Sequence, residues 1–355
     1  MGQHIEIVPT TNLDASHWQR WLELQSSNPA LDSPYFHPHF AQALQRHGLR
    51  TLTAVISEAG QVVAFVPYQT HGRLVGRPGG WPIADFQAPV CADGFELDLL
   101  AFLRAGGLDT FTFDHWLAQR PEIQQYVERT RPSPYMDVSG GLARYLERIG
   151  ESGQRRWKFT QNRLRKVERE LGSLRLEFQS TGNSMFDRLL EWKRSQYRET
   201  GSGDLFANPA YVAFFRDLLR IDDAGFRGLL SVLWAGETPL AAHAGIALGG
   251  VLHWWFPAYD PRHAGYSPGY LMLAKLTEDA PLHGLTRVDL GKGEEQYKAQ
   301  IKTGQTMVAE GIVDVRPARQ WLRAHTRGIR AALKYSAPAH WLRQARKRLR
   351  AKPKH

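Results

Sequence analysis

Three predicted strands follow one another in the second half of the chain, and this succession constrains the fold more than any other feature. The strands are apolar runs closed by glycine-containing turns, and they cover Arg227–Trp234, Pro239–Leu248 and Gly250–Tyr259. A helix over Pro268–Ala280 and a strand over Arg287–Leu290 are predicted next. Strands that continue into helix and strand in this way indicate an α/β (α+β) domain.

The first half of the chain has similar alternating patterns. Its predicted strands are Ile5–Val8, Leu52–Ser57, Val62–Tyr68 and Phe111–Phe113, and its predicted helices are Trp18–Leu24, Pro38–His47 and Phe95–Arg104. The proline-containing segment Arg129–Pro134 is typical of a linker. We therefore predict one domain over residues 1–135 and a second over 136–315, and the shared pattern is compatible with a duplicated domain.

Other helices are predicted early in the second domain. They cover Leu142–Ile149, Gln154–Leu171, Met185–Glu199 and Pro209–Arg220, with a strand over Leu174–Gln179. The helix over Gln154–Leu171 is strongly basic. A chain of 355 residues with 43% hydrophobic residues has enough apolar surface for two packed cores, so a globally disordered state is excluded.

The positive charge is concentrated at the end of the chain. The formal net charge is +10, yet residues 315–355 contain thirteen Lys or Arg and no Asp or Glu. Trp321, Leu322, Ile329 and Leu333 recur at helical spacing between basic residues, which predicts a basic amphipathic helix within residues 316–355. Such a helix fits an anionic membrane surface, or it packs its apolar side on the domain; nucleic acid is a less favoured partner.

The expected location is the cytoplasm, with peripheral attachment to the inner face of the membrane through the basic tail. The longest apolar run, Leu240–Phe256, is interrupted by His243 and His253, so no transmembrane helix is expected. The N-terminal residues lack the pattern of a secretory signal, and the single cysteine, Cys91, cannot form an internal disulfide.

Two loops after predicted strands contain residues suited to ligand binding. Ser267 and Pro268 fit the start of a helix, where free amide groups favour phosphate, although such a start is often only a cap. The segment RVDLGKGEEQYK places Asp289 at a strand end before a glycine-spaced turn. That turn is either a binding loop or a charged surface turn.

Four further polar residues are candidates for chemistry or recognition. His243 interrupts an apolar strand, and it is either a core histidine or a general base. Asp85 and Gln87 lie in a Gly/Pro-rich segment that is either an acceptor site or a structural turn. Trp192 and Lys193 lie on the predicted helix Met185–Glu199, and of the two only Lys193 is expected to reach a site.

Several strings resemble the CelD/BcsL-type acetyltransferases of the GNAT superfamily, which share their fold with FemABX-like peptidyltransferases. The similar strings are SPYFHPHFAQAL, GRPGGWPIADFQAPV, LEWKRSQY, AAHAGI, WWFPAYDPRHAGYSPG and DLGKGEEQYK. They extend from Ser33 to Lys298 and leave out the basic tail. The resemblance implies two tandem GNAT-like domains, with the better preserved pocket in the second.

The resemblance also implies acyl-CoA as a co-substrate, with no permanently bound cofactor and no metal. The CoA pyrophosphate would lie on the loop that holds Arg262, Gly265, Ser267 and Gly269; Ser267 departs from the family pattern, which has Gly or Ala there. His243 would be the base or an orienting group, tuned or replaced by Asp260 or Asp289, and Lys298 would bind or polarise the substrate. The expected substrate-binding residues are Asp85, Gln87, Lys193, Tyr259, Glu294 and Tyr297.

The predicted function is N-acyl transfer from acyl-CoA to an amine by direct attack on the thioester. The acceptor would be an amino sugar or a long-chain amine, that is, a polysaccharide or lipid precursor. One alternative is a FemABX-like peptidyltransferase that uses aminoacyl-tRNA and contacts the RNA phosphates with the basic helix segment Arg155–Arg169. The other is a membrane-associated scaffold without catalytic activity.

Overall fold

The computed structural model describes residues 3–72, 74–316 and 319, so almost all of the predicted tail helix lies outside the described residues. The first half contains β1 (His4–Pro9), α1 (Ala15–Ser27), α2 (Pro38–Arg46), β2 (Leu52–Glu58), β3 (Gln61–His71), β4 (Val75–Pro78), β5 (Val90–Cys91), α3 (Leu99–Ala105), β6 (Thr110–Leu117) and β7 (Val127–Asp137).

The second half is richer in long helices. It contains α4 (Gly141–Arg148), α5 (Glu151–Leu171), β8 (Leu174–Glu177), α6 (Asn183–Thr200), α7 (Pro209–Leu218), β9 (Asp222–Asp223), β10 (Phe226–Ala235), β11 (Thr238–Leu248), β12 (Val251–Tyr259), α8 (Pro268–Asp279), β13 (Arg287–Asp289), α9 (Gln296–Ile301) and β14 (Gly304–Asp314). The predicted mixed α/β class is confirmed, as are the three successive strands of the second half.

Polar residues fix several helix starts. The Asp14 side chain accepts hydrogen bonds from the amides of Ser16 and His17 at the start of α1, and Asn208 precedes Pro209 at the start of α7. The prediction that a helix begins at Phe95 is wrong, because Asp98 caps α3 by accepting a hydrogen bond from the Ala101 amide at 2.8 Å.

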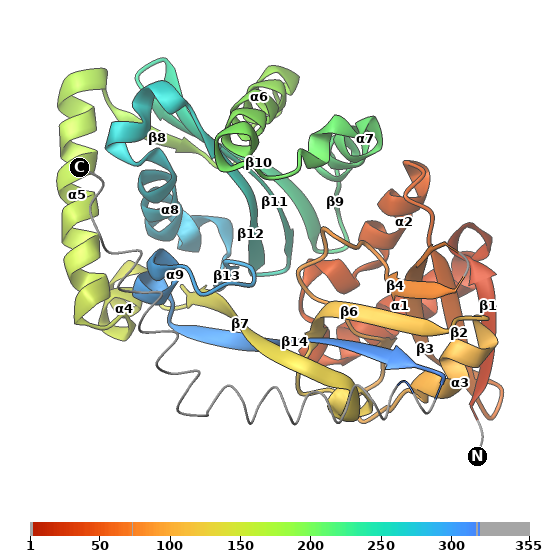
Figure 1. Cartoon of the computed structure of the whole chain (residues 1–355). Helices are drawn as coiled ribbons and strands as arrows, with labels where there is room; N and C mark the ends of the chain where they lie inside the picture. The colour runs from red at the N-terminus through yellow and green to blue at the C-terminus, as the bar shows by residue number, and fades with distance from the viewer. Residues whose placement is uncertain (1–2, 73, 317–318, 320–355) are drawn as a thin grey trace, which may run out of the picture.

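One continuous sheet runs through both halves (Figure 1), and its order shows an exchange of strands. Two series of strands run inward from the outer edges of the sheet, β1-β2-β3-β4-β6 and β8-β10-β11-β12-β13. Within each series neighbouring strands are antiparallel, except for the innermost pair, β4 with β6 or β12 with β13, which is parallel. β7 completes the second series beside β13, whereas β14 completes the first beside β6, and β7 and β14 pair with each other. The two halves therefore repeat one topology and meet at these two strands.

The predicted linker at Arg129–Pro134 is wrong, because these residues lie within β7. Their ladder partners are on β14, where Pro134 stands opposite Gln305 and Pro132 opposite Met307. The carbonyls of the two prolines accept hydrogen bonds from Leu290 and Gly293 on the other side, where β13 has ended. Because a residue's N and C=O point to the same side of a strand, the missing N–H groups cost the β14 ladder nothing.

Helices cover both faces of the sheet and divide the core into three clusters. α5 and α8 pack on one face of the second half, and α3 packs on the first half. The third cluster joins α1 and α2 to α6 and α7, with the Phe40 and Phe214 rings 5.7 Å apart. The two halves therefore share a core on the side where β12 faces the first half.

Candidate functional site

The sheet opens where β12 and β13 separate. Residues Val251–His253 of β12 pair in parallel with Arg287–Asp289 of β13, and β12 then continues beyond this pairing to Tyr259. The chain after β13 instead turns toward β7, where the Leu290 amide donates to the Pro134 carbonyl at 2.9 Å. Among the described residues, the far half of β12 therefore has no neighbouring strand on this side, and such strand ends are common sites for ligands in α/β folds.

A β-bulge lies at the point of separation. Trp254 and Trp255 on β12 both stand opposite Gly245 on β11, because the register shifts between Ala244 and Ile246. A Cβ at position 245 would overlap His243 Cε1 and lie 2.6 Å from the His253 carbonyl oxygen, so only glycine fits there. The bulge directs Trp254 into one cavity and Trp255 into another.

The first cavity, here called the strand-end cavity, has a volume of about 390 Å³. It lies between β12, α6, α8 and the start of α9, and the residues that matter for its chemistry are Lys193, Glu199, Trp254, Tyr259, Gly269 and Tyr297. Four of the predicted site residues, Lys193, Tyr259, Gly269 and Tyr297, are therefore brought together here. Burial raises the pKa of Tyr297 to about 12, so its hydroxyl remains a hydrogen-bond donor at neutral pH.

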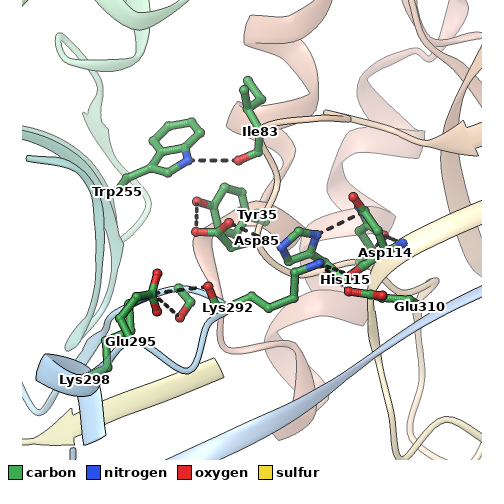
Figure 2. Close-up of polar contacts among 12 residues, drawn as sticks. Tyr35, Ile83, Asp85, Asp114, His115, Trp255, Lys292, Glu295, Lys298 and Glu310 are labelled. Atoms are coloured by element: carbon green, nitrogen blue, oxygen red, sulfur yellow. Dashed lines mark hydrogen bonds and ion pairs between the residues drawn. The ribbon is translucent and has the colours of Figure 1, made fainter. Parts of the chain in front are cut away.

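The second cavity, here called the interface cavity, has a volume of about 540 Å³ and lies between the two halves. Its walls combine aromatic and acidic side chains, and they include Ile83, Asp85, Tyr197, Asp204, Trp255 and Phe256. Figure 2 shows the Trp255 indole donating to the Ile83 carbonyl at 2.9 Å, a contact that joins β12 to the first half. Asp85 is the predicted acceptor-binding residue that reaches this cavity.

Asp85 lies in a polar network of side chains from the first half (Figure 2). The Tyr35 hydroxyl donates to its Oδ2 at 3.5 Å, and His115 Nε2 lies 3.8 Å from its Oδ1. Gln87 is buried behind this network: its Oε1 accepts from the amides of Asp114 and His115, and its Nε2 donates to Asp114. Gln87 therefore supports β6 at His115, and it lines neither the strand-end cavity nor the interface cavity.

The loop after β13 is held closed by Lys298. Its Nζ donates to the carbonyls of Gly291 and Lys292 at 3.1 and 3.2 Å and lies 3.2 Å from Glu295, as Figure 2 shows in part. Lys298 is buried, while the predicted Glu294 pairs with Arg131 at 3.5 Å on the surface. In this arrangement Lys298 shapes the loop and leaves no N–H free for a substrate.

His243 is enclosed within the sheet. Its Nε2 accepts a hydrogen bond from the Trp255 amide at 3.2 Å, and its ring stacks on Trp254 with centroids 4.0 Å apart. Burial lowers the pKa of His243 to about 3, so the imidazole is neutral. Of the two predicted roles for His243, this geometry favours orientation of the bulge over proton transfer.

Asp289 belongs to a separate buried cluster. Its Oδ2 lies 3.2 Å from His253 Nε2 and 3.3 Å from Arg287, and Ser33 Oγ lies 3.0 Å from the same His253 nitrogen. Burial raises the pKa of Asp289, but His253 and Arg287 outweigh this effect and hold the pKa below its ordinary value. The carboxylate of Asp289 lies on neither cavity wall.

Asp260 and Arg262 form the first turn of the loop before α8. The Asp260 carboxylate accepts from the Arg262 amide at 2.9 Å and from its guanidinium at 2.6 Å, while the Asp260 amide donates to Leu240. Because Leu240 lies three residues before His243 on β11, Asp260 and His243 are not neighbours. Arg262 is exposed, with 73% of its side chain accessible.

Ser267 occupies the predicted N-cap position of α8 but caps the helix without its side chain. Its backbone is left-handed, with φ 57° and ψ 57°, and its hydroxyl accepts from Arg163 of α5. α5 also places the Arg156 guanidinium 4.0 Å from the centre of the Tyr270 ring. No motif in the sequence marks Arg163 or Arg156 as a site residue, and the strong basicity of this helix is the signal that points to them.

Comparison with known proteins agrees with this geometry. Residues 154–299 match the family model described as an acetyltransferase (GNAT) domain. No curated protein sequence matches the chain. Solved structures with a similar fold include FemX (TM-score 0.59, 9% identity, 91% of this chain and 99% of that one) and a tandem GNAT protein from the clavulanic acid biosynthesis pathway (TM-score 0.52, 11% identity, 89% and 99%).

A third similar structure is the C-terminal domain of a putative lysylphosphatidylglycerol synthetase from Agrobacterium fabrum (TM-score 0.53, 14% identity, 90% and 98%). At these identities the structural likeness shows the fold. Together with the sequence match over residues 154–299, it confirms the expectation of a GNAT-type acyltransferase built on a tandem GNAT-like fold. The CelD/BcsL-type resemblance is narrower and stays a prediction.

The described residues contain neither a membrane-spanning helix nor a metal-binding cluster. Across residues 3–72 and 74–316, no helix is both long and apolar enough to cross a bilayer. In the same part of the chain, no group of three or more His, Cys, Asp or Glu side chains is arranged to hold a metal ion.

Proposed function

We propose that the protein transfers an acyl group from acyl-CoA to the amino group of a polysaccharide or lipid precursor. The observation that carries the proposal is that two cavities adjoin the β12 bulge, one beside the loop that starts α8 and the other between the halves. The strand-end cavity would hold the thioester end of the donor. The loop with Arg262, Gly265, Ser267 and Gly269 would bind its pyrophosphate, with Arg163 next to Ser267.

The interface cavity would hold the acceptor. Its carboxylate, Asp85, suits an ammonium group, and the rings of Tyr197, Trp255 and Phe256 suit the carbon face of a sugar ring or an alkyl chain. An amino sugar and a long-chain amine both combine these features. The basic residues 316–355 are proposed to hold the protein on an anionic membrane surface, which would favour a lipid-linked acceptor.

The proposed reaction is direct attack of a neutral amine on the thioester carbonyl, without a covalent enzyme intermediate. The enzyme then needs to hold the two reactants in line and to donate hydrogen bonds to the carbonyl oxygen as negative charge develops. Tyr259 and Tyr297 at the wall of the strand-end cavity are the proposed donors. His243 would act indirectly, because its contact with the Trp255 amide fixes the bulge between the cavities.

Ligand-induced thermal stabilisation tests the donor cavity without any assumption about the acceptor. CoA, acetyl-CoA and palmitoyl-CoA should each raise the melting temperature, because a ligand at a hundredfold excess over its Kd adds about 2.7 kcal/mol to the stability of the native state. Gly269→Leu should abolish the rise, since nothing lies within 4 Å of a Cβ there and the side chain would enter the strand-end cavity.

Gly203→Leu is the matched control. Gly203 is equally open but lines the interface cavity, so its variant should keep the stabilisation by CoA while weakening the binding of an acceptor. If the folded wild-type protein shows no rise with any of the three ligands, or if both leucine variants lose it equally, the assignment of the donor cavity is wrong.

A further inference from the structure

The amino group of Lys193 lies between the strand-end cavity and two aromatic rings of the interface cavity. Lys193 projects from α6 and forms part of the wall of the strand-end cavity. Its Nζ also lies 5.6 Å from the ring centre of Tyr197 and 5.8 Å from that of Phe256, and both rings line the interface cavity. A reacting amine and a thioester carbonyl that approach each other from the two cavities would therefore meet beside this nitrogen.

The surroundings of Lys193 do not neutralise a positive charge. Its Nζ donates to the Pro257 carbonyl at 3.0 Å, and within the described part of the chain no carboxylate forms an ion pair with it. Among the described residues, the ionisable groups that line the strand-end cavity with Lys193 are Glu199 of α6, Tyr259 of β12, Tyr270 of α8 and Tyr297 of α9, and Tyr197 and His243 also interact with its charge. Burial lowers the pKa of Lys193 to about 8, so a substantial fraction is neutral near physiological pH.

We propose that Lys193 is the general base of the acyl transfer, an inference that rests on the proposed function. The amine nitrogen of the acceptor forms a bond to the thioester carbonyl carbon, and its proton passes to the neutral Nζ of Lys193. The carbon–sulfur bond then breaks, and the protonated Nζ gives its proton to the departing thiolate. The products are the amide and free CoA thiol, and the neutral lysine is regenerated.

Other groups near the bulge are less suited to this step. The Nε2 lone pair of His243 is occupied by the Trp255 amide, and its ring is enclosed. The Asp85 carboxylate reaches the interface cavity but is absent from the wall of the strand-end cavity. Lys193 lines the strand-end cavity and its Nζ lies beside two rings of the interface cavity, and a lysine with a lowered pKa is a known type of general base.

The activity test compares Lys193→Gln and Lys193→Arg with the wild type, using release of CoA thiol from acetyl-CoA in the presence of a panel of amino sugars and alkyl amines. Each variant should lose 100-fold or more in kcat while keeping the rise in melting temperature with CoA. The wild-type kcat should rise with pH around an apparent pKa near 8, and this limb should be missing in both variants. Lys302→Gln, at the surface after α9, should retain the wild-type rate and profile.

Three results would overturn the proposal. Lys193→Arg with the wild-type rate would show that no neutral amine is needed there, and an unchanged pH limb in Lys193→Gln would place the base elsewhere. Direct titration of the Lys193 Nζ by ¹⁵N NMR, assigned with Lys193→Arg, should give a pKa near 8, and a value near 10.4 would exclude the role without any activity measurement. A wild type that transfers acyl groups to no amine would instead refute the proposed function.

Discussion

The buried imidazole of His243 shows why a histidine within an apolar strand is ambiguous at the level of the residue. Its strand position and apolar neighbours could be predicted from the sequence, and so could its two possible roles. What the sequence does not contain is the contact with the Trp255 amide, because that contact depends on the bulge in the neighbouring strand. The same contact leaves the ring neutral, enclosed and stacked on Trp254.

This burial predicts a dependence of stability on pH. The unfolded imidazole takes up a proton as the pH falls below 6.5, whereas the folded one, with a pKa of about 3, does not, so stability decreases as the pH falls. Between pH 6.5 and 5 the contribution of His243 should be a loss of about 2 kcal/mol in the free energy of unfolding.

Urea unfolding of the wild type and His243→Gln at both pH values measures this loss. In His243→Gln, whose side chain can still accept from the Trp255 amide, the free energy of unfolding should fall by about 2 kcal/mol less between the two pH values than in the wild type. In the variant of the exposed His71, His71→Gln, it should fall as much as in the wild type. Identical pH dependence in the wild type and His243→Gln would contradict a neutral buried imidazole.

At the level of the element, the bulge of β12 separates the two cavities and depends on one glycine of β11. Gly245→Ala should lower the free energy of unfolding by about 1–3 kcal/mol, because its methyl group would overlap His243 and the His253 carbonyl. It should also reduce acyl transfer, since the overlap is relieved most easily by movement of the bulge. Thermal and urea unfolding together with the CoA-release assay measure both effects.

Gly265→Ala is the control for that variant. Its Cβ would have nothing within 4 Å, so its cost in stability should stay below about 0.5 kcal/mol. Equal costs for the two alanine variants would mean that the close contacts at position 245 do not constrain the strand.

Element by element, local signals predicted much of the fold and little of the site. The turns and apolar runs of β10, β11 and β12 are local, as is the Ser-Pro start of α8, and all were predicted. β7 was mistaken for a linker because prolines usually break strands, and β14 was not predicted because its partners lie far away in the sequence. The candidate residues Asp85 and Lys193 were found, but their cavities depend on packing between the halves.

At the level of the whole molecule, a set of charged and polar side chains that includes the buried His253 and Asp289 joins the two halves. Arg287 on β13 forms a bidentate ion pair with Asp32 of the first half at 2.6 and 2.9 Å and also contacts the fully buried Asp289. His253 links the same Asp289 to Ser33 of the first half. The relative position of the halves, and with it the interface cavity, therefore depends on this set.

Removing different members of the set should have different costs. Arg287→Met leaves the Asp289 carboxylate buried without its arginine partner, and it should lower the free energy of unfolding by about 3–5 kcal/mol. Asp32→Asn removes a carboxylate that is 43% exposed, and it should cost about 1 kcal/mol or less. Urea unfolding of both variants tests the difference, and similar losses would argue against Asp289 as the group that needs Arg287.

The exchange of β7 and β14 has a consequence for biosynthesis. When the ribosome has made residues 1–135, the edge of β6 that β14 will cover is still open, because β14 is the last described strand to be translated. Both edges of β7 likewise stay unpaired until β13 and β14 have been translated. The first half of the nascent chain therefore cannot finish folding before the second is translated, and the two halves mature together although their topologies are repeats.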